Sequence, residues 1–489
     1  MEQQPLVLAI DQGTTNTKAV LVDASGKVIS RASAPLTSHY PRPGWAEQSA
    51  DAIWNSVQSV IADIVAGDHG PIGGIAISNQ RETLVVWDAE TGAPLAPAIL
   101  WQCRRTAVAC QALVDAGHDA AVVDQTGLSI NALFPASKLG WVMENVASAR
   151  DLAEQGRLRA GTVDSWLLFK MTDGAVFATD HSNASRTMLF DTVRLVWSAE
   201  LCALFKVPLS ALPSPLPSNS RFGETGAGAT ALPGGIPILT MMGDSHAALY
   251  GHGVRRPGLV KATYGTGSSL MTLTDGRVAS RHGLSSTIAW SDDGGVAYAL
   301  EGNITVSAQA LAFAATLLGL AGPAALSDLA QSVPESGTVV FVPALAGLGA
   351  PHWVDDATGT VSGMTHATRP AHIARATIEA VALQIADVFE AMQQDTGLDL
   401  AGLMADGGAS TNDFLMQVQA DVLDRPVLRG DQPEVGALGA AAMAFGAMGI
   451  QPPEPSHARH FSPGALSADA RTDLLARWRQ ALMRVKMTL

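Results

Sequence analysis

The stretch "AIDQGTTNTKAVLVD", residues 9–23, decides the fold of the first half of the chain. Apolar residues lead to Asp11 and resume at Ala19, with glycine and hydroxyl residues between them. This pattern predicts two β-strands joined by a turn. The turn is either a plain hairpin or a phosphate cradle, which needs converging backbone N–H groups, small residues and hydroxyls. Its cradle residues would be Thr14, Thr15, Asn16 and Lys18, and Asp11 could hold Mg²⁺ through water.

Composition excludes several classes of protein. The chain has 489 residues, of which 47% are hydrophobic and 16% charged, so we expect a globular protein of two domains. The net charge of -14 argues against nucleic acid or an anionic membrane surface as a partner. We therefore expect small-molecule substrates and a homodimer or homotetramer.

The three cysteines indicate a reducing compartment. Cys103, Cys110 and Cys202 are an odd, sparse set, which argues against a disulfide framework and a zinc site. The first residues, "MEQQPLVLAIDQG", lack the basic start and long apolar core of a secretion signal. The uncharged stretch from Ile304 to Leu326 contains polar residues and Pro323, and we expect a buried Ala-rich helix there. A cytoplasmic protein fits these features.

Strands and helices alternate along the first half. Strands are expected at 74–78 and 83–87, and helices at 54–66, 107–115 and 138–146. The alternation predicts a mixed α/β domain.

The second half repeats the opening pattern. The stretch "GLVKATYGTGSSLMTLTDG", residues 258–276, again predicts a strand, a Gly/Thr turn and a strand. We therefore expect domains at 1–250 and 251–489, which would enclose a cleft. The second turn, with Gly265, Thr266 and Gly267, could hold phosphate from the other side or be another hairpin.

A third glycine turn follows a later apolar strand. In "LMADGGASTNDFLMQ", residues 403–417, the strand leads to Gly407 and Gly408, and a helix capped by Ser410, Thr411 or Asn412 follows. The glycines would let a flat ring approach the backbone, and Asn412 could bind it. The alternative is an ordinary strand–turn–helix connection.

Two further motifs suggest chemistry on an alcohol. Asp244 follows the apolar strand 238–242, where it could act as a general base or merely cap a helix. Arg81 and Glu82 in "SNQRETLVVW" can donate to and accept from neighbouring hydroxyls, although a surface ion pair has the same sequence. Trp101 in "LWQCRRT" could pack on a carbon chain.

Together these motifs resemble the FGGY carbohydrate kinases, in particular their glycerol-kinase-like branch. The motifs "DQGTTNTK", "NQRET", "WQCRRTA", "PASKLGWVMEN", "NASRTMLF", "YGTG", "GLGAP", "GTVSGMTHATRPAHIARATIE" and "DGGASTNDFLMQ" occur in the family's order over nearly the whole chain. The resemblance implies an α/β fold of two ribonuclease-H-like domains, of the actin and chaperone-ATPase type, that close over a central cleft.

The resemblance also implies roles for residues. Asp244 matches the catalytic base, and Arg81, Glu82 and Trp101 match residues that hold the polyol. ATP would be held through its phosphates by Thr14, Thr15, Asn16, Lys18 and the Gly265–Gly267 turn, and through its adenosine by Gly407, Gly408 and Asn412, with Mg²⁺ near Asp11. The chain departs from the family at Ala308, where a glycine is usual, and at Ala312, where a glutamine is usual.

Three departures concern the acceptor substrate. Leu133 stands where glycerol kinases have tyrosine, Ser245 where they have glutamine, and Ser269 where they have an aromatic residue. Smaller side chains enlarge the pocket, and lost hydrogen-bond partners penalise the old substrate. We therefore expect an ATP-dependent kinase for a terminal hydroxyl of a longer polyol or ketose.

Four alternatives stay open on the sequence. The chain could be a true glycerol kinase with a rebuilt pocket, or a xylulose- or ribulose-type kinase. It could also be a nucleotide-switched binding protein of the actin-like fold, or a regulator of sugar uptake that binds sugar without turnover.

Overall fold

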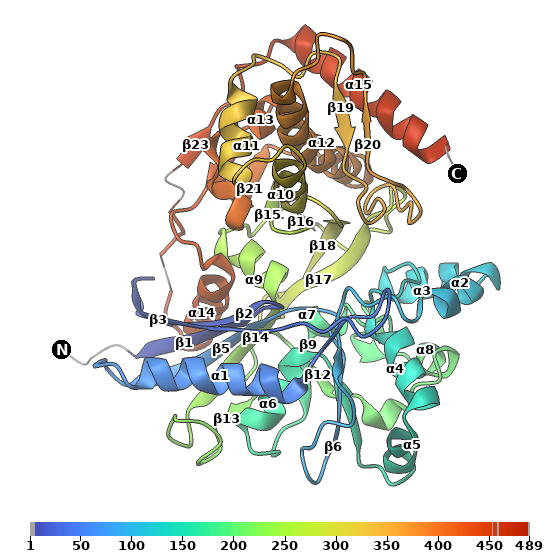
Figure 1. Ribbon diagram of the computed structural model, residues 1–489. Helices are drawn as coiled ribbons and strands as arrows, with labels where there is room; N and C mark the ends of the chain where they lie inside the picture. Colours follow the sequence, from blue (N-terminus) through green and yellow to red (C-terminus); the bar gives the residue numbers. More distant parts are fainter. Residues whose placement is uncertain (1–4, 452, 457–458, 488–489) are drawn as a thin grey trace. The chain divides into compact units, whose positions relative to one another are not determined.

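The computed structural model describes residues 5–451, 453–456 and 459–487, and the chain divides into two compact units (Figure 1). The first unit runs to Gly253 and also takes in Ser286–Tyr298 and Glu434–Glu454. The second unit contains Val254–Ser285, Ala299–Pro433 and the chain from Pro455 onward. The expected division after residue 250 is near the Gly253 boundary, but two segments of the second half belong with the first unit.

A six-stranded sheet forms the centre of the first unit, in the order β13-β14-β5-β1-β2-β3. Its strands are β1 (Leu6–Gln12), β2 (Asn16–Val22), β3 (Val28–Pro35), β5 (Ile72–Asn79), β13 (Gly223–Glu224) and β14 (Pro237–Gly243). β1 and β2 are antiparallel, which confirms the predicted hairpin. β1, β5 and β14 are parallel, so their carboxyl ends meet at one edge of the sheet.

Helices cover both faces of this sheet (Figure 1). On one face α1 (Ala50–Val65) buries an apolar stripe that includes Ile53, Val57 and Ile61. On the other face lie α9 (Asp244–Gly251) and α14 (Val435–Ala447). A Cβ on Gly439 of α14 would overlap the carbonyl oxygen of Ala247 in α9. This close helix contact explains why residues 434–454 return to the first unit.

Between β3 and β13 the first unit also contains several shorter elements, of which α6 (Val163–Met171) packs into the core of the six-stranded sheet. The other helices among them are α2 (Ala107–Asp115), α3 (Asp119–Thr126), α4 (Pro135–Asn145), α5 (Ala147–Glu154), α7 (His181–Ala184) and α8 (Ala199–Leu204), with the 3₁₀ turn Leu209–Ala211. The strands among them are β4 (Glu47–Gln48), β6 (Val85–Asp88), β7 (Ala98–Ile99), β8 (Leu158–Gly161), β9 (Ala178–Asp180), β10 (Phe190–Asp191), β11 (Val196–Trp197) and β12 (Ser214–Leu216). Cys103, Cys110 and Cys202 are all buried and form no disulfide.

A second sheet has seven strands in the order β17-β18-β16-β15-β21-β22-β23. Most of these strands belong to the second unit, whereas β17 from Ser286 onward and the first residues of β18 fall in the segment Ser286–Tyr298 of the first unit. The strands are β15 (Leu259–Tyr264), β16 (Ser268–Thr274), β17 (Ser285–Asp292), β18 (Gly295–Ile304), β21 (Gly402–Asp406), β22 (Val427–Arg429) and β23 (Arg459–Phe461), and β19 (Val340–Val342) pairs with β20 (Thr360–Ser362). The helices are α10 (Ala308–Leu317), α11 (Pro323–Gln331), α12 (Pro370–Thr396), α13 (Asp413–Leu423) and α15 (Ala468–Met487). β15 pairs antiparallel with β16 and parallel with β21, which repeats the pairing of β1 with β2 and β5.

The prediction of a single helix from Ile304 to Leu326 is wrong. Ile304 ends β18, α10 spans only Ala308–Leu317, and α11 begins at Pro323. Gly319 and Gly322 have φ angles of 67° and 154°, which end one helix before the next begins. Among the described residues, every helix is too short or too polar to cross a membrane.

Candidate active site

The turn between β1 and β2 is held by side chains of the first unit. The Gly13 N–H donates to the Asn16 carbonyl at 3.0 Å and closes the turn. The Thr14 hydroxyl donates to Gln80 Oε1 at 3.2 Å and accepts from the Trp101 indole N–H at 3.0 Å. Thr15 and Asn16 are exposed at the tip. Thr14 therefore links a predicted phosphate turn to a predicted polyol residue.

Acidic groups stand at the carboxyl edge of the first sheet. Asp11 is half-buried at the end of β1 and accepts from the Ser78 hydroxyl at 2.9 Å. A Cβ on Gly436 would lie 4.0 Å from Asp11 Oδ1 and 3.5 Å from the Asp244 carbonyl oxygen. Gly436 therefore lies near both strand ends, and its lack of a side chain leaves space beside Asp11.

Asp244 begins a row of alternating charges. Its Oδ1 lies 3.0 Å from Arg81 Nε and also accepts from the Ser245 N–H. Arg81 Nη1 lies 4.0 Å from Glu82 Oε1, and Arg186 Nε donates to that same oxygen at 2.7 Å. Arg81 and Glu82 are only 7% and 5% exposed, so the surface ion-pair interpretation is wrong. The Asp244 side chain is 43% exposed and can meet a substrate.

The remaining predicted acceptor residues fall in both units. Trp101 is 38% exposed, Leu133 is half-buried, and Ser245 is buried on α9. Ser269 belongs to the second unit, where its hydroxyl donates to the buried Glu301 at 2.8 Å. The first unit alone therefore assembles Asp244, Arg81 and Glu82 with their charged neighbours.

The turn between β15 and β16 is held by backbone groups. The Gly265 N–H donates to the Gly267 carbonyl at 2.9 Å. The Ser307 N–H donates to the Thr266 carbonyl at 2.9 Å, and the Ala308 N–H to the Gly265 carbonyl at 3.1 Å. These bonds fasten the turn to the start of α10, whose first residue is Ala308.

In the Gly407–Asn412 turn, some residues are required by the packing of the chain and others are accessible to a ligand. Gly407 has φ of 88°, and a Cβ there would lie 2.6 Å from the Tyr264 carbonyl oxygen. A Cβ on Gly408 would meet nothing within 4 Å, so its backbone is open to a ligand. Asn412 caps α13, since its side chain accepts from the Leu415 N–H at 3.1 Å. Its amide nitrogen also donates to the Ser327 hydroxyl at 3.1 Å.

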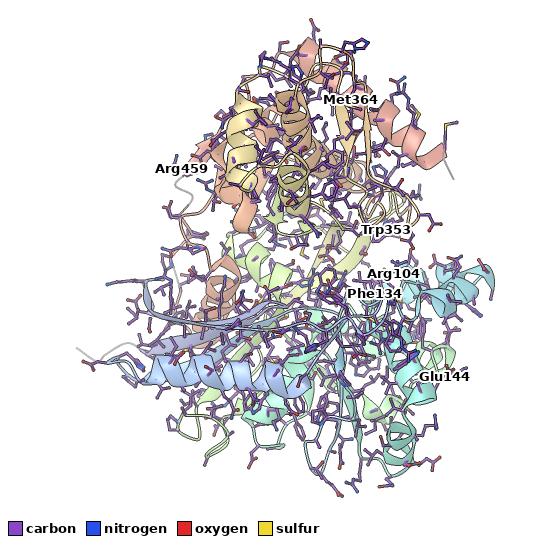
Figure 2. The ribbon with its side chains drawn as sticks, in the orientation of Figure 1. Arg104, Phe134, Glu144, Trp353, Met364 and Arg459 are labelled. Carbon is purple, nitrogen blue, oxygen red and sulfur yellow. The ribbon has the colours of Figure 1, made fainter. Side chains whose placement is uncertain are left out.

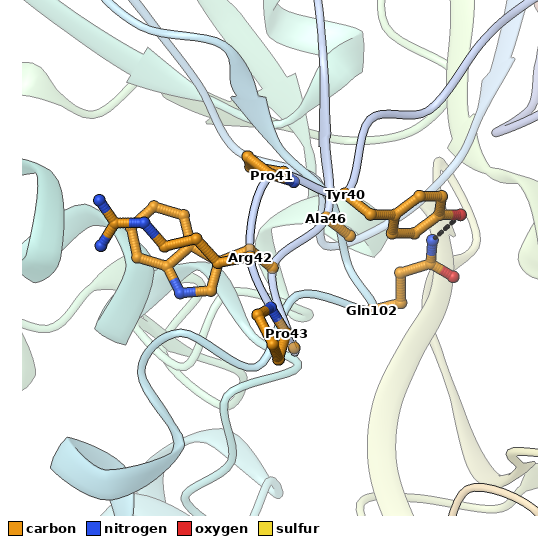
Figure 3. Close-up of a pocket in the computed structure, with 8 residues that line it drawn as sticks. Tyr40, Pro41, Arg42, Pro43, Ala46 and Gln102 are labelled. Atoms are coloured by element: carbon orange, nitrogen blue, oxygen red, sulfur yellow. Dashed lines mark hydrogen bonds between the residues drawn. The ribbon is translucent and has the colours of Figure 1, made fainter.

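An open groove of about 500 Å³ lies elsewhere on the first unit (Figure 3). It is lined by residues 40–46 and Gln102, whose amide donates to the Tyr40 hydroxyl at 3.1 Å. None of these residues belongs to the predicted site, so the groove is not the candidate active site.

Two buried cations, Arg186 and Lys138, support the site without a role that the sequence motifs predict. Arg186 in "NASRTMLF" is fully buried against Glu82, and Lys138 in "PASKLGWVMEN" is fully buried behind the same residue. Phe134, labelled in Figure 2, precedes α4, and its ring faces the Arg186 guanidinium at 5.1 Å. The sequence signal that could have pointed to them is a single arginine or lysine among apolar and small residues, since such side chains are rarely buried without a partner.

Comparisons with known proteins show the family of the chain. The N-terminal domain of the FGGY family of carbohydrate kinases matches residues 6–251, and its C-terminal domain matches residues 260–448. A glycerol kinase from Bordetella parapertussis is 44% identical over 99% of this chain and 97% of its own length. An apulose kinase from Pectobacterium atrosepticum is 46% identical over 89% and 88%.

The fold is also that of a solved kinase. The crystal structure of Plasmodium falciparum glycerol kinase with ADP superposes with a TM-score of 0.92 at 29% identity, covering 99% of this chain and 98% of that one. Fold and matches define a phosphotransferase that acts on an alcohol group of a small sugar or polyol. The chain belongs to the FGGY family of carbohydrate kinases.

Proposed function

We propose that this kinase transfers the γ-phosphoryl group of MgATP to a terminal hydroxyl of a four- or five-carbon polyol or ketose. The row Asp244–Arg81–Glu82–Arg186 is the observation that supports the proposal most strongly. It puts an accessible carboxylate beside buried donors and acceptors, which suits an alcohol that must be both bound and deprotonated.

Asp244 acts as the general base. It takes the proton of the acceptor hydroxyl while that oxygen bonds to the γ-phosphorus and the bond to the ADP oxygen breaks. Arg81, 3.0 Å from Oδ1, fixes the orientation of the carboxylate. Arg186 likewise fixes Glu82, so that both carboxylates are preset before the sugar arrives.

The two hydroxyl-rich turns would hold the phosphates. The exposed Thr15 and Asn16, with Thr14 and Lys18, serve from the first unit, and Thr266 with Gly265 and Gly267 serves from the second. Gly408 leaves its backbone open to the adenosine, beside Asn412. The first unit would thus supply most of the acceptor-binding residues, and the second would bind the adenosine.

Asp11 is the residue that would hold Mg²⁺. Its carboxylate is a hard oxygen ligand at the strand edge, and Gly436 leaves room beside it. Within the described residues no three acidic, histidine or cysteine side chains gather as a metal site, so water and phosphate oxygens would complete the coordination. When bound, the ion neutralises charge on the phosphates.

The size of the acceptor is inferred from three positions. Leu133, Ser245 and Ser269 remove side chains that resemblance places in the glycerol kinase pocket. The similarity to an apulose kinase, at 46% identity, supports an acceptor other than glycerol. The similarity to glycerol kinases supports the alternative of a true glycerol kinase with a rebuilt pocket.

The test is ADP formation against a panel of glycerol, erythritol, threitol, ribitol, xylitol, arabitol, xylulose, ribulose, erythrulose, dihydroxyacetone and apulose. We expect the highest kcat/KM for a four- or five-carbon acceptor. If glycerol gives by far the highest value, the enlarged-pocket argument is wrong. If no acceptor gives turnover, the kinase proposal itself is overturned.

Asp244→Asn tests the base. We expect kcat on the best acceptor to fall by about 10²- to 10⁴-fold with little change in the KM for ATP. Asp63→Asn, an exposed aspartate on α1, is the matched control and should keep wild-type turnover. Near-normal turnover of Asp244→Asn would exclude this residue as the base.

A further inference from the structure

Lys138 is buried at the junction of three loops of the first unit. It lies in the first turns of α4, with no exposed surface. Its ammonium donates to the carbonyl oxygens of Leu133 at 2.7 Å, Glu82 at 3.1 Å and Trp101 at 3.3 Å. An ammonium has three N–H donors, and these three bonds use all of them.

The three carbonyls belong to residues that we place around the acceptor sugar. Glu82 follows β5, Trp101 follows β7, and Leu133 precedes α4, so the loops are distant in sequence. Glu82 also has φ of 59°, a backbone conformation that costs energy for a residue with a side chain. Such a conformation persists only where neighbouring groups fix it, and Lys138 binds the carbonyl of that residue.

We propose that Lys138 is the positioning residue of the acceptor site and sets the spacing of Glu82, Trp101 and Leu133 through their backbone carbonyls. The inference rests on the proposed function only in assigning these residues to the sugar. Lys138 does not touch the substrate, so its loss should weaken acceptor binding and leave nucleotide binding intact.

A purely structural role explains Lys138 less well. Burial lowers its pKa from 10.5 to about 7, although the nearby Glu82 carboxylate opposes the shift. The lowered pKa means that the charged form is held at a cost in stability. A purely structural position would favour well-packed apolar side chains, which avoid that cost. What the ammonium adds is three donors on one tetrahedral nitrogen, which hold three loops at once.

The experiment compares Lys138→Met and Lys138→Arg with Val142→Ala. Val142 is fully buried on the same helix but makes only apolar contacts in its cluster, so it controls for general loosening of α4. Each full-length variant is assayed for the KM of the best acceptor, the KM of ATP and kcat. Hydrogen–deuterium exchange of the ligand-free protein is followed for peptides covering residues 80–84, 99–103 and 131–135.

We expect Lys138→Met to raise the acceptor KM by about 10- to 100-fold, since small displacements of positioning groups have large effects. The ATP KM should stay at the wild-type value, and exchange should rise in the three peptides together. Lys138→Arg keeps the charge but replaces three donors on one tetrahedral nitrogen by a planar guanidinium fork, and should recover only part of the acceptor affinity. Val142→Ala should lower thermal stability without either change.

Opposite results overturn the inference. An unchanged acceptor KM in folded Lys138→Met would do so, as would exchange that rises in only one of the three peptides. The same pattern in Val142→Ala would also do so, because α4 packing would then suffice as the cause. If Lys138→Met does not fold, Lys138→Arg decides by the same readouts. The exchange measurement needs no substrate, so it stands even if no acceptor gives turnover.

Discussion

The β1–β2 and β15–β16 turns, which we propose hold the phosphates, are both rich in glycine and threonine, but different groups hold each turn in place. One backbone bond closes each turn, from Gly13 to Asn16 and from Gly265 to Gly267, and the difference lies in the bonds to neighbouring elements. The β1–β2 turn has one further backbone bond, from the Leu36 N–H to the Thr15 carbonyl, and is otherwise held by the Thr14 side chain, which bonds both Gln80 and the Trp101 indole. The β15–β16 turn is held by backbone, since the carbonyls of Gly265 and Thr266 accept from the first N–H groups of α10. Both turns join an antiparallel pair whose first strand also pairs in parallel with a later strand.

This difference predicts different kinds of sensitivity. A turn fastened by backbone depends on close approach of main chains, and it tolerates side-chain changes better than an added Cβ. A turn fastened by side chains depends on the identity of those side chains. A substitution in the first turn should also affect acceptor binding, because Thr14 of this turn accepts a hydrogen bond from Trp101.

Adding a methyl group at one glycine of each turn should give the largest effect. A Cβ on Gly267 would overlap the Ile304 carbonyl oxygen, whereas one on Gly13 would lie 3.1 Å from the Asn16 carbonyl oxygen. We expect Gly267→Ala to destabilise the fold by about 1–3 kcal/mol and to raise the KM for ATP, because the turn must move away from the end of β18. Gly13→Ala should have a smaller effect on both.

Thermal unfolding and ATP titration measure these effects. Equal losses in the two alanine variants would show that both turns are packed alike, and the distinction between backbone and side-chain support would fail.

Removing the hydroxyl at matched threonines should give the next effect. Thr14→Val leaves the Trp101 indole N–H without its acceptor and removes one of two donors to Gln80 Oε1, which keeps the Thr83 hydroxyl at 2.9 Å. We expect the KM values for ATP and for the acceptor both to rise by about fivefold, the equivalent of one hydrogen bond of about 1 kcal/mol. Thr266→Val keeps the backbone bonds of its turn and should raise only the KM for ATP.

Initial rates with each substrate varied in turn separate the two constants. The proposed link between the first turn and the acceptor site would be contradicted if the acceptor KM changes in Thr266→Val. It would also be contradicted if the acceptor KM does not change in Thr14→Val.

The sequence predicted the strands and turns because their signals are local. The alternation of apolar residues with Gly/Thr turns gives β1–β2, and its repeat gives β15–β16, as the structure confirms. The predicted helix 304–326 fails for a local reason too, since Gly319 and Gly322 outweigh the apolar composition around them.

The support of the site could not be predicted in the same way. The bonds of Lys138 join residues 56, 37 and 5 positions apart, and the Arg186–Glu82 pair joins residues 104 positions apart. Such contacts depend on tertiary packing, which no periodicity in the sequence reveals. The motifs gave the residue types at the site, and the structure adds which groups hold them in place.

A pH series should give the smallest effect and extends the comparison to Lys138. The charged or titratable groups nearest its ammonium are Glu82, Cys103, Arg105 and Cys110. As pH rises through the lowered pKa of about 7, the ammonium becomes an amine with two donors for three carbonyls. One loop then loses its bond, and we expect the acceptor KM to rise by about two- to fivefold between pH 6 and about pH 8.5.

Stability should move the other way. The pKa of Lys138 is about 7 in the folded protein and near its ordinary 10.5 in the unfolded chain, so the folded state releases its proton first. The unfolding free energy therefore gains from this group as pH rises between these values and is independent of it below pH 7. Lys138→Arg does not titrate in this range and should show neither trend. If the acceptor KM of Lys138→Arg follows pH as that of the wild type does, another group causes the pH dependence. The side chains that support the site in the first unit would then be those of Thr14 and Trp101, without Lys138.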